Sequence, residues 1–387
     1  MSRRADPAGP AQPAVVITGL AVACAAGRGA AALLSNAFSG TPAFTPVTRF
    51  DPGRYSVKVA ATLPDAGPLA DELAGAVDGA WTGAGLTAGQ RAGCPLLLAA
   101  HRDPGTARLP AAARRAANAR GGLARALATR TGLTGPLRTY ITACVSASTA
   151  VADGAAMIVA GRAPRVVVAA GYLVTEDDFA LFDSGRALAR DGRVRPFSSG
   201  RQGLLLGDGV AAVVIESAAS AAGRGAPALA RLAGWGRAGD AHHVCRPHPE
   251  GTGAARAITS ALRRAGIEAG DVGYVNAHGT ATAWNDPAEA AGLHSALGAH
   301  AATVPVSSTK SVLGHALDAS GLVELVVTTV ALRERRLPVN GGFLAADPAC
   351  PVNVIVDGPL RARPRYALSL NTAFGGANTA LLVEAAP

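Results

Sequence analysis

Cys144 is the first residue whose setting indicates nucleophilic chemistry. It follows the strand-like run at 137–142 and opens the small-residue segment CVSASTAVADGAAMI, so we expect it at a strand-to-helix turn. The N-terminus of a helix lowers the pKa of a thiol and favours the reactive thiolate. The small residues that follow allow backbone and substrate to approach closely. The alternative, which is the more common one for a single cysteine, is a buried structural residue.

Two histidines also follow predicted strands. His278 lies in the segment NAHGTAT, where glycine and threonine residues indicate a turn that presents the ring to a cleft. A histidine that only caps the end of its strand is the alternative. His315 ends the segment SSTKSVLGH, which predicts a strand, a polar loop and the entry to a helix.

Lys310 is one of only two lysines in a chain with 36 lysine and arginine residues. Since arginine supplies a plain positive charge nearly everywhere else in the chain, a lysine is informative. Glu324 lies 14 residues later in the apolar segment GLVEL, where a carboxylate must be paired or protonated. We predict an ion pair between Lys310 and Glu324, with the structural role of positioning the loop that carries His315.

A glycine turn, NTAFGGAN at 371–378, separates the last two predicted strands. Its backbone N–H groups can stabilise an oxyanion, and a plain hairpin turn is the alternative. The thiol, the two imidazoles and this turn all lie at ends of predicted strands, where the sites of α/β sheets form. A single thiol with two histidines and no third carboxylate resembles no protease arrangement.

The elements that position these residues alternate between strand and helix. This alternation predicts an α/β architecture with parallel sheets, and both halves end in a pair of strands, which indicates an internal duplication. We expect a flexible leader at 1–13, an N-terminal half at 14–217 that carries Cys144, and a C-terminal half at 228–387 that carries both histidines. The segment between them, AASAAGRGAP, is predicted to be a hinge. Strands are predicted at 15–20, 95–100, 138–142, 165–171, 209–216, 272–277, 304–307, 366–370 and 379–384, and helices at 255–264, from 286, and after 307 as far as 333.

Composition narrows the class of protein. Of 387 residues, 49% are hydrophobic and 16% charged, which excludes disorder of the whole chain. The net charge of +9 comes from scattered arginines, which suit an acidic partner, and no zinc spacing, recognition helix or aromatic-basic interleaving supports binding to nucleic acid. The five cysteines are far apart and never form CxxC, so neither a disulfide framework nor a metal site is expected. No apolar run reaches about 18 residues, so we expect no membrane span and a cytoplasmic location.

With these motifs in this order, the sequence resembles the elongating β-ketoacyl-acyl-carrier-protein synthases of the thiolase fold, in particular members from type II polyketide or other secondary metabolism. The resemblance runs over almost the whole chain. His278 and His315 are 37 residues apart, which suits that family, as does the separation of Lys310 from Glu324. The matching segments are VVITG at 15–19, TAC at 142–144, FD and RAL within 182–188, RPF at 195–197, GDG at 207–209, and 276–286, 308–324 and 374–378.

The resemblance implies two duplicated βαβαβ-type halves that form a five-layered αβαβα sandwich. It implies that Cys144 accepts an acyl chain, with the backbone N–H groups of Cys144 and Phe374 as the oxyanion hole and the Phe374 ring as a gate. His278 and His315 would bind the malonyl thioester carbonyl and promote decarboxylation. Lys310, together with its predicted partner, would organise the site. The supporting residues implied by the motifs are Glu324, Asp286, Thr280, Thr282 and Asn378.

Asp286 and its neighbour Glu289 also have a simpler explanation. The segment DPAE at 286–289 has the pattern of a helix start, with an acidic N-cap, proline at the first helical position and glutamate two residues later. Helix capping therefore explains both carboxylates as well as a place in the site does.

The implied reaction is a decarboxylative Claisen condensation. Cys144 takes an acyl chain from a carrier thioester, malonyl-carrier then loses carbon dioxide, and the resulting carbanion attacks the acyl group. No metal or organic cofactor is implied, because the phosphopantetheine arm arrives with the acyl carrier protein. The family also implies a dimer, either of identical subunits or with a related ketosynthase or chain-length-factor subunit.

Several motif positions depart from the family pattern. They lie around the pocket and its loops and not at the reactive residues. They are therefore expected to affect the preferred acyl chain and the partner protein more than the activity itself, and they indicate a specialised, secondary-metabolic member. The departures are Ser198 in place of Asp, Ala281 in place of Gly, Asp318 and Ser320 in place of small residues, and Thr372 in place of Phe.

Two other functions remain open at this point. The first is acyl transfer from Cys144 to water, an amine or an alcohol without condensation. The two histidines favour condensation, because simple transfer does not need two donors to an enolate. The second is a non-catalytic chain-length partner subunit, against which the presence of Cys144 argues.

Overall fold

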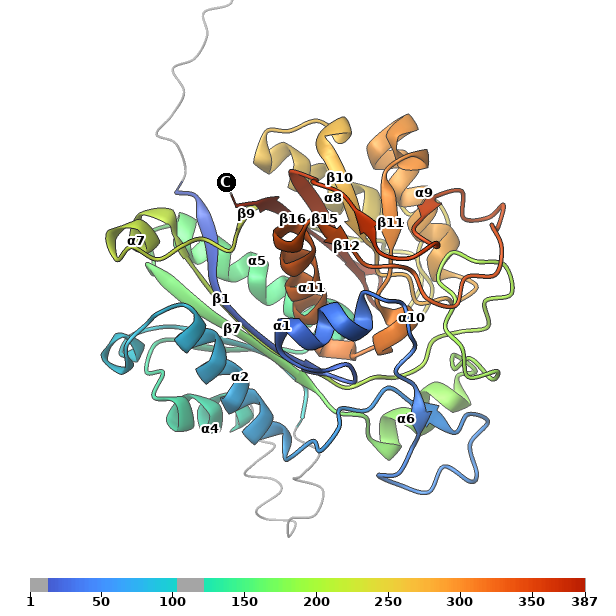
Figure 1. Ribbon diagram of the computed structural model, residues 1–387, viewed down its shortest axis with the longest axis horizontal. Coiled ribbons are helices and arrows are strands. Elements are labelled where there is room, and N and C mark those ends of the chain that lie inside the picture. The colour runs from blue at the N-terminus through green and yellow to red at the C-terminus, as the bar shows by residue number, and fades with distance from the viewer. Residues whose placement is uncertain (1–12, 103–121, 387) are drawn as a thin grey trace, which may run out of the picture.

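The fold is built from two arrays of β-strands with the same internal order. The computed structural model describes residues 13–102 and 122–386, so the leader predicted at 1–13 lies almost wholly outside the described residues (Figure 1). In the N-terminal half the strand order is β6 (Leu137–Tyr140), β5 (Leu96–Ala99), β7 (Arg165–Tyr172), β8 (Gly209–Ser217) and β1 (Val15–Cys24). In the C-terminal half the corresponding order is β11 (Pro305–Ser307), β10 (Val272–Asn276), β15 (Tyr366–Thr372), β16 (Ala377–Ala385) and β9 (Ala230–Gly239), with β13 (Asn353–Val354) beyond β11.

The directions of pairing also repeat, which shows the duplication that the sequence indicates. β5 is parallel to β6 and β7, and β10 is parallel to β11 and β15. β8 is antiparallel to β7 and β1, and β16 is antiparallel to β15 and β9. Residues Val15–Ile17 of β1 pair with Ala230–Leu232 of β9 and join the two arrays.

The prediction of parallel sheets is therefore right for only part of each array, and both arrays are mixed. The long antiparallel strands β1 and β8 are buried along most of their length. Because helices cover both faces of these strands, their sequences are continuously apolar, as expected for parallel strands. A continuous apolar run thus indicates that a strand is buried on both faces, but it does not indicate whether the strand pairs in parallel or antiparallel fashion.

Two helices form the middle layer between the arrays. α5 (Ser146–Val159) packs on β5, β7 and β8, α11 (Ser320–Glu334) packs on β15 and β16, and the two helices pack on each other. α11 is buried on every side from Ser320 to Leu332. A helix that is buried all round carries apolar residues on every face, which explains the sequence of α11.

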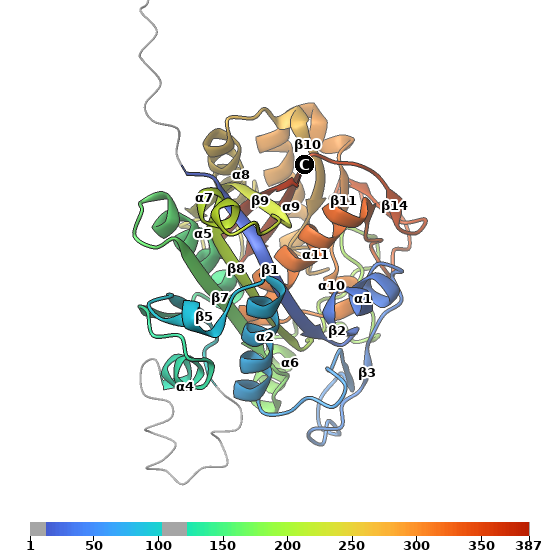
Figure 2. The ribbon, with the colours of Figure 1, turned by 60° about the vertical axis from the view of Figure 1, so that its left-hand side comes forward.

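The remaining long helices cover the outer faces. α2 (Leu69–Gly83) and α4 (Gly122–Thr131) cover the N-terminal array, and α8 (Thr252–Ala265) covers the C-terminal array with α9 (Asn285–Leu297) beside it (Figures 1 and 2). The result is the five-layered αβαβα sandwich of the thiolase fold.

The single helix predicted after residue 307 is interrupted. α10 (Lys310–Leu313) ends at Gly314, which has a φ of +70°. The His315 backbone then pairs with another segment, since its N–H donates to the Leu205 carbonyl (2.8 Å) and its carbonyl accepts from the Gly207 N–H (3.1 Å). The break between α10 and α11 therefore holds His315 in an extended bridge instead of on a helix.

The segment predicted as a hinge contains a helix. Within 218–227, α7 (Ala218–Gly223) is capped by the Ser217 side chain, which accepts from the Ser220 N–H (3.1 Å). Alanine has the highest helix propensity, and serine is a favoured N-cap, so this local sequence favours a helix over an extended linker.

The other elements are short. They are α1 (Gly29–Ala32), α6 (Glu176–Ser184), a π-helical turn (Leu33–Ala37), β2 (Gly27–Arg28), β3 (Thr45–Pro46), β4 (Val59–Ala60), β12 (Arg336–Leu337) and β14 (Leu360–Arg361). Across residues 13–102 and 122–386, no helix has both the length and the apolar composition needed to cross a lipid bilayer.

The packing of α8 on β9 requires glycine at Gly236. A Cβ at this position would lie 1.9 Å from the Ala257 carbonyl oxygen in the backbone of α8. We expect Gly236→Ala to lower the free energy of unfolding by roughly 1–3 kcal/mol or more, because the helix must move away. Gly75→Ala is the control: Gly75 is an exposed residue of α2 with no atom within 4 Å of an added Cβ, so the change should stabilise by about 0.5–1 kcal/mol. Urea denaturation measures the free energy of unfolding of both variants. An equal change in the two would contradict the conclusion that the packing of α8 on β9 requires glycine at this position.

Candidate active site

A strained turn carries the cysteine. Cys144 lies in the 3-10 turn Ala143–Val145, between β6 and α5, and Ala143 has a φ of +51°. Such a conformation is unfavourable for a residue with a Cβ, so neighbouring contacts must hold it. The Ser146 hydroxyl accepts from the Thr142 N–H (2.8 Å) and lies 2.7 Å from the Ala143 carbonyl oxygen, and thus closes the turn.

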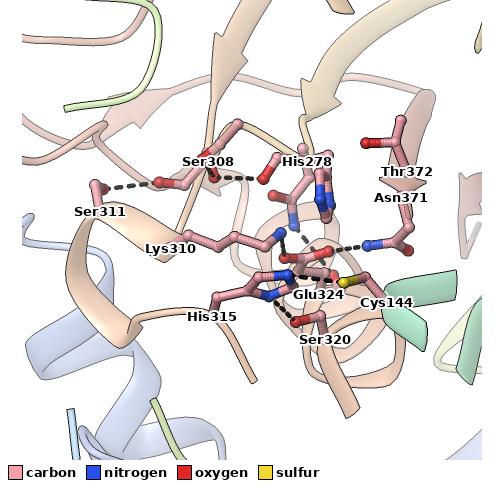
Figure 3. Close-up of polar contacts among 12 residues, drawn as sticks. Cys144, His278, Ser308, Lys310, Ser311, His315, Ser320, Glu324, Asn371 and Thr372 are labelled. Atoms are coloured by element: carbon pink, nitrogen blue, oxygen red, sulfur yellow. Dashed lines mark hydrogen bonds and ion pairs between the residues drawn. The ribbon is translucent and has the colours of Figure 1, made fainter. Parts of the chain in front are cut away.

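His315 contacts the thiol directly. Its Nε2 lies 3.0 Å from the Cys144 Sγ, and its Nδ1 lies 2.9 Å from the Ser320 Oγ (Figure 3). Burial, with the positive charge of Lys310, holds the pKa of His315 well below its usual range. The imidazole is therefore neutral and, in the tautomer with a bare Nε2, accepts the thiol proton.

The thiol itself is protonated at rest, and the expectation of a thiolate is wrong. Burial raises the pKa of Cys144 to about 12, the negative charge of Asp318 adds to this effect, and Lys310 opposes it. Removal of the sulfur from water outweighs the helix N-terminus, whose effect is confined to its first turn. Nucleophilic attack by the sulfur must therefore be coupled to transfer of its proton to His315.

His278 provides the second imidazole. Its ring lies nearly perpendicular to that of His315, at 83°, with the ring centroids 5.3 Å apart. Burial holds the pKa of His278 well below its usual range, and its buried Nδ1 has no hydrogen-bond partner among the described residues. A buried polar atom is normally satisfied, so the ring has unused hydrogen-bonding capacity beside the His315 imidazole.

The predicted ion pair between Lys310 and Glu324 is present (Figure 3). Both side chains are buried, at 2% and 3% exposure. The second oxygen of Glu324 accepts from the Asn371 Nδ2 (2.5 Å). Burial raises the pKa of Glu324, and the ammonium group of Lys310 opposes this rise. Because Lys310 is on α10 and Glu324 on α11, the pair ties together the two helices on either side of His315.

Asp286 and Glu289 hold the loop that carries His278, and neither is an N-cap. α9 begins at Asn285, with Trp284 as its N-cap. Glu289 accepts from the His278 N–H (2.6 Å) and the Gly279 N–H (2.8 Å). The two carboxylates lie in the first turns of the helix, but their oxygens bind amides of other segments.

The carboxylate of Asp286 joins two loops. It accepts from the Ala281 N–H (3.0 Å) and the Phe197 N–H (2.8 Å). Burial raises the pKa of Asp286 to about 6 and that of Glu289 to about 7, and the amide donors oppose both rises. These two buried carboxylates therefore mainly fix the backbone of the loops around the site.

One pocket unites the reactive residues. It has a volume of about 370 Å³, and Cys144, His278 and His315 all line it. Phe374 lines it as well, is 54% exposed, and stacks on Phe182 with centroids 6.2 Å apart. The position of the ring in the lining is observed, and its role as a gate stays a prediction. The predicted residues that line this pocket are Cys144, Thr280, Thr282, His278, His315 and Phe374.

Two threonines of the lining also fix its loop, and Asn378 acts at one remove from the pocket. The Thr280 and Thr282 hydroxyls lie 3.0 Å apart, and Thr282 accepts from the Asn285 N–H (3.2 Å). Asn378 does not line the pocket, and its Nδ2 donates to the Oδ1 of Asp240 (2.9 Å), which does.

Several residues of the site were not predicted from the sequence. The sequence pattern places Asn371 only in a turn, although a polar residue in an apolar closing strand is a usable signal. Arg246 stacks on the Trp284 ring at 4.4 Å, and both line the pocket. Arg186 also lines it and adds a second exposed cation. No group of three or more His, Cys, Asp or Glu side chains in the described part of the chain has the arrangement of a metal site.

The Lys310–Glu324 pair makes a testable contribution to stability. Glu324→Gln leaves the buried ammonium group without its counter-charge, so we expect it to cost about 3–5 kcal/mol. The double variant Lys310→Met, Glu324→Gln should recover most of this loss, because no buried charge remains. Urea denaturation measures both, with Glu176→Gln as the control: its partner Arg54 is 71% exposed, and we expect a change of less than about 1 kcal/mol. A double variant as unstable as Glu324→Gln would contradict this account.

Comparison with known proteins gives the same family over both halves. Residues 54–221 match the model of the β-ketoacyl synthase N-terminal domain, and residues 229–343 match that of the β-ketoacyl synthase C-terminal domain. The chain is 33% identical over 258 residues to 3-oxoacyl-[acyl-carrier-protein] synthase 2 of Staphylococcus aureus. That match covers 65% of this chain and 64% of the relative, which is just under two thirds of its length.

Two solved structures share the fold over nearly the whole chain. The ishigamide ketosynthase/chain length factor superposes with a TM-score of 0.90 at 28% identity, over 97% of this chain and 100% of the other. A ketosynthase from a type II polyketide synthase, solved with its acyl carrier protein and bound to the hexaketide, superposes with a TM-score of 0.87 over 97% of this chain and 100% of the other. At 23% identity this second likeness shows the fold alone. From its two matching domains and its fold, we conclude that the chain belongs to the β-ketoacyl synthase family.

Proposed function

We propose that the chain is a β-ketoacyl-[acyl-carrier-protein] synthase of type II polyketide or fatty-acid-like biosynthesis. One observation carries the proposal: a buried thiol lies 3.0 Å from a neutral imidazole, and a second neutral imidazole adjoins the first in the same open pocket. A thiol and one base suffice for acyl transfer. The second imidazole supplies a further hydrogen-bond donor, which formation of an enolate needs and simple transfer does not.

In the first step Cys144 accepts an acyl group. The sulfur attacks the carbonyl carbon of an acyl-carrier thioester while its proton passes to the Nε2 of His315. The backbone N–H groups of Cys144 and Phe374 stabilise the oxyanion of the tetrahedral intermediate. The bond to the carrier sulfur then breaks, the carrier thiolate takes the proton from His315, and an acyl-Cys144 thioester remains.

In the second step a malonyl-carrier thioester replaces the free carrier. Its carboxylate leaves as carbon dioxide, and the electron pair of the broken C–C bond forms an enolate on the thioester. His278 donates a hydrogen bond to the enolate oxygen. His315 donates a second one in the tautomer that carries its proton on Nε2, in which Nδ1 accepts from the Ser320 hydroxyl. The carbanion attacks the acyl carbonyl, and Cys144 departs as a thiolate. It takes a proton from water, because the loss of neutral carbon dioxide from a carboxylate consumes one proton overall. The product is a β-ketoacyl chain on the carrier, two carbons longer than the acyl donor.

The proposed partner is an acyl carrier protein. Carrier proteins are acidic, and the pocket has the exposed cations Arg186 and Arg246 in its lining, within a chain of net charge +9. The hydroxyls of Thr280 and Thr282 lie on the same lining and suit a polar pantetheine arm.

We propose no resident cofactor, because that arm arrives with the carrier. Since both substrates are then bound to a carrier protein, we place the reaction in the cytoplasm.

We also propose a dimer through the edge strand β6. This strand ends the order of the N-terminal array, and Leu137 is 36% exposed on it. Ile141, directly after β6, is 67% exposed. An exposed edge with apolar side chains is a template for a second strand. The partner is a second copy or a related ketosynthase or chain-length-factor subunit.

The proposed reaction is tested by intact mass. After exposure to acyl-carrier thioesters of several lengths, the wild-type protein should gain the acyl mass, and Cys144→Ala should not. Addition of malonyl-carrier should release carbon dioxide and remove the acyl mass. We expect His278→Ala to retain acylation but to lose condensation by about 100-fold or more, since one donor to the enolate is gone.

The two alternative functions give different results in this experiment. An acyl-enzyme that malonyl-carrier never discharges, but that water, an amine or an alcohol does, would establish the acyltransferase. No adduct from any donor, combined with co-purification with another synthase, would establish the non-catalytic chain-length partner.

The proposed interface is tested by Ile141→Glu. A carboxylate at this exposed apolar position should be buried without a partner in the dimer, so we expect the measured mass to fall towards that of one subunit. Light scattering coupled to size exclusion measures this change. Leu344→Glu is the control, because Leu344 is similarly exposed (61%) but lies far from β6 in the sequence and outside the edge strand. An unchanged dimer in Ile141→Glu would place the interface elsewhere.

A further inference from the structure

A buried carboxylate lies beside the turn that carries the nucleophile. Asp318 is 3% exposed, in the 3-10 turn Leu317–Ala319, at a position where the family pattern has a small residue. Its Oδ1 accepts from the Ser146 hydroxyl (2.9 Å), the same hydroxyl that accepts from the Thr142 N–H. Asp318 is therefore connected to the backbone next to Cys144 through one side chain.

The other oxygen of Asp318 pairs with His101. His101 follows β5, and its Nδ1 contacts the Asp318 Oδ2 across the interface between sheet and turn. The carboxylate of Asp318 raises the pKa of His101, Asp178 adds to this, and burial and Arg102 oppose it. His101 is therefore protonated to a higher pH than an ordinary histidine, and while it is protonated it places a positive charge against Asp318.

We propose that Asp318 and His101 form a positioning pair for Cys144, in which Asp318 holds the nucleophile turn through Ser146 and His101 offsets part of the negative charge that Asp318 brings to the sulfur. The proposal rests on the proposed function in one respect, since it takes Cys144 as the reacting group. Neither residue is assigned contact with the substrate.

The charges around the sulfur explain why a cationic partner for Asp318 is needed. The charged groups that act on Cys144 are Asp318, Lys310 and Glu324. Lys310 and Glu324 neutralise each other, so Asp318 would be an uncompensated negative charge without His101. Both the thiolate and the tetrahedral oxyanion place negative charge at Cys144, which a nearby carboxylate opposes.

The sign of the pH dependence follows from the raised pKa of His101. The pair is intact below the ordinary pKa of histidine, and its contribution is lost as the pH rises through the raised value. Above that value a net negative charge remains near Cys144. Proton loss from His101 therefore makes the thiol harder to ionise.

The rate of alkylation of Cys144 by iodoacetamide, measured as a function of pH, tests the proposal without any carrier protein. Peptide mass mapping separates Cys144 from the exposed Cys245. Asp318→Asn removes the negative charge, so we expect alkylation about tenfold faster at a given pH, equivalent to a pKa lower by about one unit. His101→Gln leaves Asp318 without its cationic partner, so we expect the opposite shift at pH values below the raised pKa of His101, where the wild-type imidazole is charged. The double variant should resemble Asp318→Asn.

Opposite changes in the alkylation rate of Cys144 in the two single variants support the proposal. Loss of a merely structural contact would change the rate in the same direction in both variants. Shifts in the same direction, or no shift in either folded variant, overturn it. If Asp318→Asn fails to fold, His101→Gln decides alone, and an unchanged profile overturns the proposal. Asp153→Asn is the matched control: Asp153 is on α5, as Ser146 is, and pairs with Arg237 (2.9 Å), away from the groups that act on Cys144.

The result is separable from the test of the proposed function. A protein that takes no acyl group from any carrier but shows opposite alkylation shifts contradicts the synthase reaction and supports the positioning pair. A protein that condenses normally but whose alkylation profile is the same in all variants contradicts the positioning pair alone.

Discussion

The contact between α5 and α11 is the constraint on which the site depends. α5 begins directly after the turn of Cys144, and α11 begins one short turn after the bridge of His315. The approach of the two N-terminal ends therefore sets the distance between sulfur and imidazole. Gly321 allows this approach, because a Cβ there would lie 2.8 Å from the Ser148 amide nitrogen. The duplicated topology supplies equivalent helices, and their close packing makes one site from two halves.

The electrostatic design follows from burial. The thiol and both imidazoles are neutral in a medium where charge is costly, and the charged groups near them occur as pairs. A neutral resting site avoids the cost of a buried ion and leaves hydrogen-bond donors directed at charge that develops during reaction. Buried carboxylates such as Glu289 are used mainly to fix loops through amide donors.

Much of the site was predictable because its residues lie at strand ends, where local pattern is strong. The positions of Cys144 and His278 after β6 and β10, and the pairing of Lys310 with Glu324, follow from apolar runs, rare residue types and the need to pair a buried carboxylate. The state of the thiol was predicted wrongly, because a helix N-terminus is visible in the sequence and the depth of burial is not. The break that holds His315, and the contact of His101 with a residue 217 positions away, depend on tertiary packing that no local pattern encodes.

The bridge at His315 has a consequence for how the chain can vary. The backbone of this residue, from the C-terminal half, is hydrogen-bonded to Leu205 and Gly207 of the segment that leads into β8 of the N-terminal half. The C-terminal half therefore does not hold its own reactive side chain in place unaided. Exchange of one half for that of a divergent relative would change the hydrogen bonds that hold His315, even if every residue lining the pocket were retained. The two halves must therefore evolve together for the arrangement of the site to be preserved.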